Sequence, residues 1–271
     1  MRSMEKIVSK SFWLKYQNRY QELGSHVCVG LDSRLDLLPP CLQKADNPIW
    51  HFNRAIIDAT ADYATAYKPN LAFYLADGIR GLEALYKTVS YIPSQIPVIL
   101  DCKVGDIGST MQGYVEAFFK DIKVDAITIN PLMGKDVLLP LLEHEGSFAF
   151  ALALTSNPSA DDFFHKADMR HKVASWLADF DESRLGAVVG ATQVSHLQEM
   201  RMMMPGRLFL IPGVGAQGGD LDAVLRYAID SPADPRILIN SSRGIIFASR
   251  DTDFATVAGM KAKELYRACK G

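Results

Sequence analysis

A chain of 271 residues, 48% of them apolar, can bury a large core, and α/β barrels of this size often form one undivided domain. The formal charge of −2, with Lys and Arg scattered along the chain, argues against a nucleic-acid-binding protein. No apolar stretch approaches the roughly 18 residues of a membrane span, and residues 1–24 lack a signal-peptide core, so we expect neither a membrane partner nor export.

Eight short apolar runs, separated by helix-length stretches, follow one another along the chain. Most are nearly continuous in Val, Ile, Leu, Ala or Phe, as expected for parallel strands that are covered on both faces. Apolar residues at helical spacing occupy 53–63 and 111–122, and residues 10–23 predict an extra helix before the first strand. The predicted strands are 26–32, 65–68, 97–103, 126–130, 148–154, 185–190, 208–214 and 237–240.

This alternation is typical of the α/β class and predicts a (β/α)8 TIM barrel with an extra N-terminal helix, occupying residues 1–271 as a single domain. A doubly wound open sheet is the main alternative, because periodicity alone does not show that a sheet closes. A fused second domain is not expected. In a barrel, catalytic residues lie at the carboxyl ends of the strands, and phosphate often binds after strands seven and eight.

Cysteine and histidine spacing gives no support for a disulfide framework or a metal site. None of the cysteines belongs to a CxxC pair, and the six histidines form no HExxH or His-x-His pattern. We therefore expect free thiols in a reducing cytoplasm and no bound metal. The four cysteines are Cys28, Cys41, Cys102 and Cys269.

The run 101–106 places three charged residues at the end of the third predicted strand. Because strand side chains alternate between faces, Asp101 and Lys103 point the same way and Cys102 points the opposite way. Asp106 follows Gly105, where the chain can turn. Such a cluster costs folding energy unless its charges pair, and it shifts the pKa values of its members. The run therefore predicts either a structural ion-pair network or a catalytic centre.

Other polar residues also follow predicted strands. Asp32 ends the first strand, Lys68 ends the second, and Ser156 follows the fifth. Taken singly, each is more typical of a turn, a helix N-cap or an exposed strand end. Their shared position at the carboxyl ends of strands favours one common site.

Two loops after the seventh and eighth strands carry the features of a phosphate site. The stretch 213–219 is rich in glycine, which lets backbone N–H groups approach an anion, and Asp220 is placed to cap the following helix. A tight turn without a ligand is the alternative. A dinucleotide site is disfavoured because Asp234 precedes the next strand instead of ending it. Arg243 has the planar donor fork that suits phosphate.

These motifs resemble those of the orotidine 5′-monophosphate decarboxylase family, in its longer bacterial subgroup. The resemblance extends over nearly the whole chain and rests on Asp101-x-Lys103-x-x-Asp106 with Lys68 one strand upstream, and on the runs 154–158, 212–219 and 240–244. It implies a carboxy-lyase that converts orotidine 5′-monophosphate (OMP) to UMP and CO2 in de novo pyrimidine biosynthesis. It also implies a homodimer with shared active sites and no cofactor.

The resemblance implies a role for each charged residue of the array. Lys103 would protonate C6 of the pyrimidine, and Asp101 would lie beside the substrate carboxylate. Lys68 and Asp106 would complete an alternating Lys–Asp–Lys–Asp array, with the Asp106 position supplied by the partner subunit. Loss of CO2 leaves a carbanion in the ring plane, which needs fixed positive charge nearby and then a proton.

The resemblance also implies a set of substrate-binding residues. Asp32 and Lys68 would contact the ribose hydroxyls, and Thr110 of the partner subunit would help to hold the ribose. Ser156 would contact the pyrimidine. Gln217 would bridge toward the phosphate, and Arg243 would bind it.

Two other functions remain open at this point. A metal-dependent sugar-phosphate decarboxylase or synthase of the same phosphate-binding superfamily also carries an Asp-x-Lys strand, although Lys68 and the Gln217 loop argue against it. A non-catalytic nucleotide-binding barrel is the second, but it would be expected to lose part of the charged array, and all four members are present.

Overall fold

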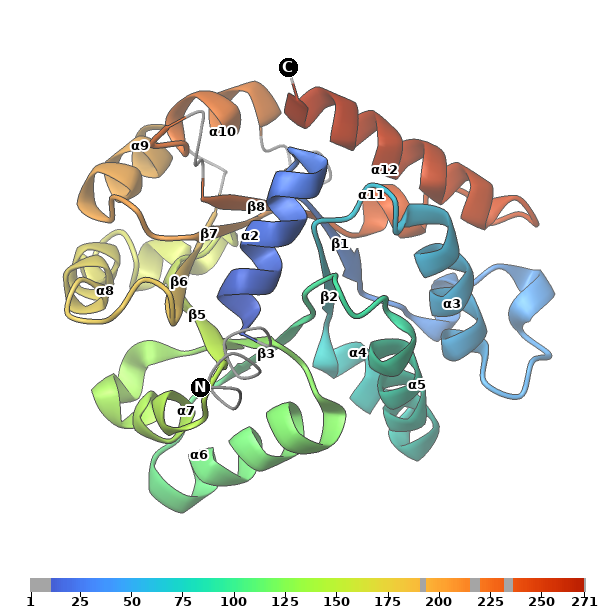
Figure 1. Cartoon of the computed structure of the whole chain (residues 1–271), viewed down its shortest axis with the longest axis horizontal. Helices are drawn as coiled ribbons and strands as arrows, with labels where there is room; N and C mark the ends of the chain where they lie inside the picture. The colour runs from blue at the N-terminus through green and yellow to red at the C-terminus, as the bar shows by residue number, and fades with distance from the viewer. Residues whose placement is uncertain (1–10, 191–193, 215–219, 232–235, 271) are drawn as a thin grey trace, which may run out of the picture.

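Eight parallel strands form the centre of the molecule, and helices surround them (Figure 1). The computed structural model describes residues 11–190, 194–214, 220–231 and 236–270. The strand order is β2-β1-β8-β7-β6-β5-β4-β3, and parallel bridges from Tyr67 to Val98 and from Asn70 to Asp101 join β2 to β3. The sheet therefore closes, and the predicted (β/α)8 barrel is confirmed. The strands are β1 (Val27–Leu31), β2 (Ala66–Pro69), β3 (Ile99–Val104), β4 (Ala126–Ile129), β5 (Phe148–Leu154), β6 (Leu185–Val189), β7 (Phe209–Pro212) and β8 (Ile237–Ser241).

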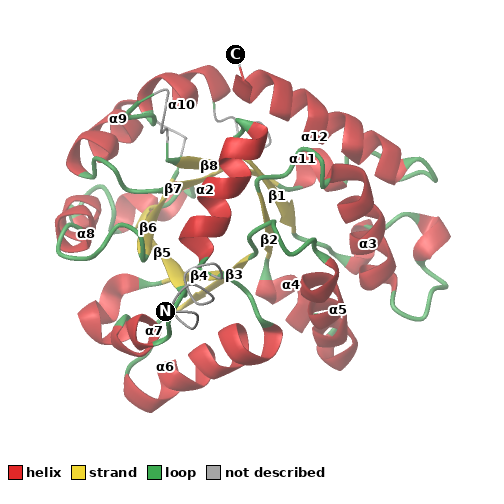
Figure 2. Cartoon of the chain, viewed as in Figure 1, coloured by secondary structure: helices red, strands yellow, loops and turns green. Residues whose placement is uncertain are grey.

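The helices lie outside the barrel, as Figure 2 shows. The side chain of Asp220 accepts hydrogen bonds from the N–H groups of Asp222 and Ala223, so the predicted cap is confirmed. None of the helices in the described ranges combines the length and hydropathy that a bilayer-spanning helix needs. The α-helices are α2 (Phe12–Leu23), α3 (Pro48–Thr60), α4 (Leu71–Leu75), α5 (Gly78–Tyr91), α6 (Gly108–Val115), α7 (Leu139–Glu143), α8 (Met169–Leu177), α9 (Val194–Met203), α10 (Leu221–Tyr227), α11 (Arg243–Ile246) and α12 (Phe254–Lys270).

Short helical turns occupy several of the remaining connections. One of them corrects the helix predicted over 111–122, because α6 ends at Val115 and continues as a π-helix. The wider turn still buries Phe118, Phe119 and Ile122, so the apolar face that predicted the helix is kept. These elements are η1 (Leu35–Leu37), η2 (Pro40–Leu42), η3 (the π-helix, Glu116–Ile122), η4 (Pro131–Val137) and η5 (Pro158–Asp162).

Helix α2, the predicted extra helix, lies across one end of the barrel (Figure 1). Its Phe12 ring packs against Phe148 and Phe150 of β5, with ring centroids 4.5 and 5.6 Å apart. Both phenylalanines belong to the cluster of side chains that fills the barrel interior. Phe148 begins β5, so α2 covers the end of the barrel at which the strands begin. The opposite end, where the strands finish, is left for a site.

The end of β8 approaches β1 closely at Gly30. A Cβ atom at Gly30 would lie 1.8 Å from the Oγ of Ser242. Only glycine therefore fits at this position of β1 while the end of β8 approaches so closely. The close approach brings the start of α11, and with it Arg243, to the rim of the barrel.

Candidate active site

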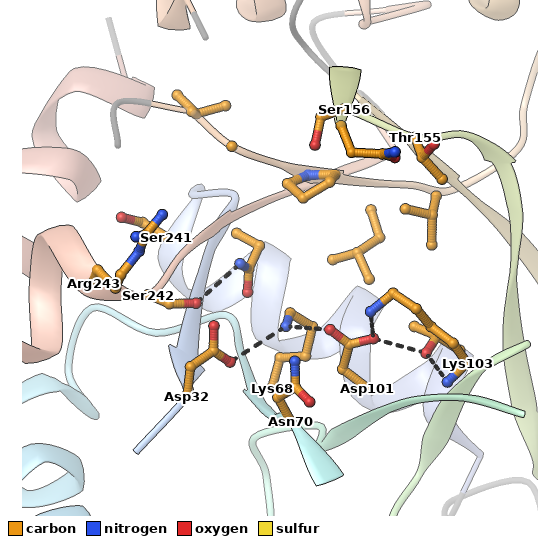
Figure 3. A pocket seen from close by; sticks show the side chains of 18 of the residues that line it. Asp32, Lys68, Asn70, Asp101, Lys103, Thr155, Ser156, Ser241, Ser242 and Arg243 are labelled. Atoms are coloured by element: carbon orange, nitrogen blue, oxygen red, sulfur yellow. Dashed lines mark hydrogen bonds and ion pairs between the residues drawn. The ribbon is translucent and has the colours of Figure 1, made fainter. Parts of the chain in front are cut away.

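A cavity of about 490 Å³ opens at the carboxyl ends of the strands (Figure 3). This volume suits a nucleotide-sized ligand. Regular strands present every second side chain to it, as with Leu210 and Pro212 on β7. Of the predicted site residues, the cavity is lined by Asp32, Lys68, Asp101, Lys103, Ser156 and Arg243.

The charged residues form a row across the floor of the cavity. Lys103 Nζ lies 2.5 Å from Asp101 Oδ1, and Lys68 Nζ lies 3.0 Å from Asp101 Oδ2. The row continues to Asp32, whose Oδ1 is 3.9 Å from Lys68 Nζ. Because the charges alternate, the attraction between neighbours offsets the free-energy cost of burying each of them. An isolated buried charge would have no such compensation.

Burial differs sharply along the row. The side chain of Lys68 is 5% exposed and that of Asp101 is 10% exposed, whereas that of Lys103 is 48% exposed. Lys68 is therefore enclosed by its carboxylate partners. The ammonium of Lys103 is therefore the more accessible of the two to a ligand in the cavity, although both lysines line it.

Both members of the buried pair are held in their charged forms. Burial alone would raise the pKa of Asp101, but the ammonium groups of Lys68 and Lys103 lower it well below its usual range. Burial alone would lower the pKa of Lys68, but the carboxylates of Asp101 and Asp32 raise it above its usual value. The two directions agree, so Asp101 and Lys68 are both charged at neutral pH.

Two oxygen atoms that face this region are buried without a hydrogen-bond donor among the described residues. They are Oδ1 of Asp32 and Oδ1 of Asn240. Buried polar atoms are almost always satisfied in native proteins, so such atoms beside a cavity indicate groups that a polar ligand completes. Hydroxyl groups of a ligand would satisfy both.

The rim near β7 and β8 has the character of an anion site. Arg243 is exposed, and Figure 3 shows it across the cavity from Lys103. Ser241 and Ser242 lie beside it, and Gly213 (φ +87°) turns the chain after β7. Gln217 falls outside the described residues, together with the rest of 215–219. The described part of this rim therefore supplies one guanidinium and two hydroxyl groups.

Two predicted residues do not line the cavity of their own chain. Asp106 lies beyond the end of β3, and its Oδ1 accepts a hydrogen bond from the N–H of Ile107 at 2.8 Å. Thr110 lies in α6 and is exposed. Gly105 packs so closely on β4 that a Cβ would lie 2.6 Å from the carbonyl oxygen of Asn130. Beyond Gly105 the chain passes through Asp106 into α6, which contains Thr110.

The sequence analysis assigned no role to Thr128, Asn70 or Asn240, although all three line the cavity. Thr128 is the one polar residue within β4, and Asn70 lies two residues beyond Lys68. A strict period of two from known inward positions would have found them. Within the described ranges, no three His, Cys, Asp or Glu side chains converge as ligands for a metal ion.

Comparisons with known proteins find extensive similarity. The chain matches the model of the orotidine 5′-phosphate decarboxylase / HUMPS family over residues 25–256, a range that contains every cavity residue. Orotidine 5′-phosphate decarboxylase of Christiangramia forsetii is 45% identical over 249 residues, covering 89% of this chain and 91% of the relative. The structure of Leishmania donovani OMP decarboxylase is 30% identical with a TM-score of 0.79, covering 96% and 99% of the two chains. UMP synthase of Leishmania donovani is 34% identical with a TM-score of 0.80, but the match spans only 56% of that longer chain.

Proposed function

This chain belongs to the orotidine 5′-phosphate decarboxylase / HUMPS family, and from that premise we propose how its own residues convert OMP to UMP and CO2. The reaction makes it a carboxy-lyase of pyrimidine biosynthesis. The observation that carries the proposal is the row Lys103–Asp101–Lys68–Asp32, because it ends in one accessible ammonium that faces the cavity.

We assign proton donation to Lys103. The bond from C6 to the carboxylate breaks, CO2 leaves, and the electron pair remains on C6. No π-system delocalises that pair, so stabilisation depends on positive charge already in place. The Lys103 ammonium supplies this charge and then transfers its proton to C6, and the neutral amine regains a proton from solvent. Asp101 holds the ammonium at 2.5 Å, and the buried Lys68 holds Asp101 in turn.

The remaining cavity residues bind the rest of the nucleotide. Arg243 binds the phosphate at the rim near β7 and β8, and Gln217 is the second predicted phosphate contact. Asp32 and Lys68 bind the ribose hydroxyls, and Ser156 contacts the pyrimidine. A phosphate held far from C6 supplies binding energy that can be used to fix the ring against Lys103.

We further propose that two copies of the chain share their sites. Asp106 and Thr110 do not line the cavity of their own chain, as expected for residues that are supplied to a neighbour. Large apolar side chains are exposed on the segments that follow β2, β3 and β4, around the same edge of the barrel, and a second copy would cover them. Their exposed fractions are Leu75 52%, Ile79 80%, Ile107 51%, Leu132 68% and Met133 54%.

Two further assignments, the domain organisation and the location in the cell, complete the proposal. We treat residues 1–271 as one barrel domain. We place the enzyme in the cytoplasm because Cys28, Cys41, Cys102 and Cys269 are all free thiols.

The activity is tested by adding OMP to the purified protein in the presence of EDTA and following the change in ultraviolet absorbance. We expect turnover to UMP that continues after exhaustive chelation, because the charges that stabilise the carbanion belong to the protein. Loss of turnover on chelation, with recovery on adding Mg²⁺, would instead identify a metal-dependent relative.

Replacing Arg243 tests the phosphate site. Arg243→Ala should lower kcat/KM for OMP by about 10²-fold or more, since it removes a charge-assisted contact to phosphate. Any residual reaction of the phosphate-free nucleoside orotidine should be nearly unaffected. Arg250→Ala is the matched control, because Arg250 is an exposed arginine that contacts Asp36 and lies outside the cavity. Equal losses on both substrates would show that Arg243 does not act through phosphate.

A further inference from the structure

The hydroxyl of Thr128 lies at the one place where the β3–β4 ladder is broken. Leu100 pairs with Ile127 and Val104 pairs with Ile129, so three residues of β3 lie opposite Thr128 alone. This bulge contains Asp101, Cys102 and Lys103. Backbone N–H groups in such a bulge lose their partners on the neighbouring strand and must be satisfied in another way.

Thr128 Oγ1 satisfies two of these N–H groups. It accepts hydrogen bonds from the N–H of Cys102 at 3.1 Å and from the N–H of Lys103 at 2.9 Å. It also lies 2.9 Å from Asp101 Oδ1. A hydroxyl has two lone pairs and one hydrogen, so with both lone pairs engaged the hydrogen is left for the carboxylate. Thr128 is 1% exposed, so water does not compete for these bonds.

The backbone of Lys103 needs this support. Its φ of +48° lies in the left-handed region, which costs a non-glycine residue free energy unless its surroundings enforce it. In this conformation the Lys103 side chain turns into the cavity and meets Asp101. The hydroxyl of Thr128 is therefore hydrogen-bonded both to the backbone of Lys103 and to the Asp101 carboxylate that orients the Lys103 ammonium.

We infer that Thr128 is a positioning residue for the decarboxylation, one that acts through Lys103 and Asp101 without touching the substrate's phosphate or ribose contacts. The inference rests on the proposed function of Lys103 as proton donor. It predicts that removal of one oxygen atom impairs the chemical step and leaves substrate binding largely intact.

Thr128→Val keeps the shape and removes the hydroxyl. We expect kcat for OMP to fall by about 10²-fold, the loss that a misplacement of roughly 1 Å produces, with KM changed by less than about threefold. Thr128→Ser, which restores the oxygen, should recover kcat to within about threefold of wild type. Thr65→Val is the matched control, because Thr65 is equally buried and hydrogen-bonded to the carbonyl of Ser25, at the opposite end of the barrel. It should lower the melting temperature and leave kcat unchanged.

A second variant covers the case in which Thr128→Val does not fold. Thr128→Ala leaves space for a water molecule to serve the orphaned N–H groups, and it should still lose about tenfold or more in kcat, because a water is not fixed to the strand. Wild-type kcat in a folded Val or Ala variant, or a Ser variant as impaired as Val, would overturn the inference. If wild-type protein itself fails to turn over OMP, the proposed function fails instead, so the two failures are distinct.

Discussion

Lys103→Ala should lower kcat for OMP by about 10⁴-fold or more, since it removes both the positive charge that faces the developing carbanion and the proton that quenches it. The protein should remain folded, because the Lys103 side chain is half exposed and the buried Lys68–Asp101 pair stays intact. Binding of the product UMP should change little, because its phosphate and ribose contacts lie elsewhere. Steady-state kinetics together with UMP titration measure both effects.

Lys15→Ala is the matched control for this loss. Lys15 on α2 also pairs with a largely buried aspartate, Asp125, at 2.7 Å, but outside the cavity. Breaking that pair should reduce stability and leave kcat unchanged. A Lys103→Ala protein that keeps kcat within about tenfold of wild type would mean that another group donates the proton, because general acid catalysis alone is worth more than that.

Much of this site could be predicted from the sequence, because in a parallel barrel the order of the strands along the chain determines where their ends lie. Polar residues that end different strands converge at one rim, whatever their separation in sequence. Asp32 and Lys68 could each be a turn residue when taken alone, yet they meet in one row with Asp101. The helix over 10–23 could be predicted for a different reason, because its apolar residues lie on one helical face that must be buried.

What could not be predicted lies in departures from regular geometry. A strict strand alternation gives the correct side for Lys103, but not its left-handed backbone or the bulge that produces it. The π-helical turn after Val115 keeps the same apolar residues buried as an α-helix would, so the hydrophobic pattern does not distinguish the two. Thr128 was missed for a related reason. A strict period of two gives the side of the sheet on which Thr128 lies, but its importance comes from three contacts that only the folded chain brings together.

The shared site leads to a prediction of complementation between two inactive variants. Lys103→Ala and Asp106→Ala homodimers should each have almost no activity, because every site in them carries one lesion. Mixing them under conditions of subunit exchange should produce heterodimers as about half of the population. If each site combines Lys103 of one chain with Asp106 of the partner subunit, one site of every heterodimer carries both lesions and the other carries none. Activity should then recover to about a quarter of wild type, from half the dimers and half their sites.

A second mixture controls for unspecific recovery. Asp101 lies 2.5 Å from Lys103 in the same chain, so Lys103→Ala mixed with Asp101→Ala should recover nothing under any dimer arrangement. Differently tagged subunits recovered together would establish that exchange took place. If Asp106 served its own cavity, the first mixture would behave like the second, because every heterodimer site would still hold one lesion. That outcome would reject the shared site and leave the decarboxylase assignment intact. Recovery in the first mixture alone requires that the carboxylate of Asp106, absent from its own chain's cavity, crosses to the neighbour.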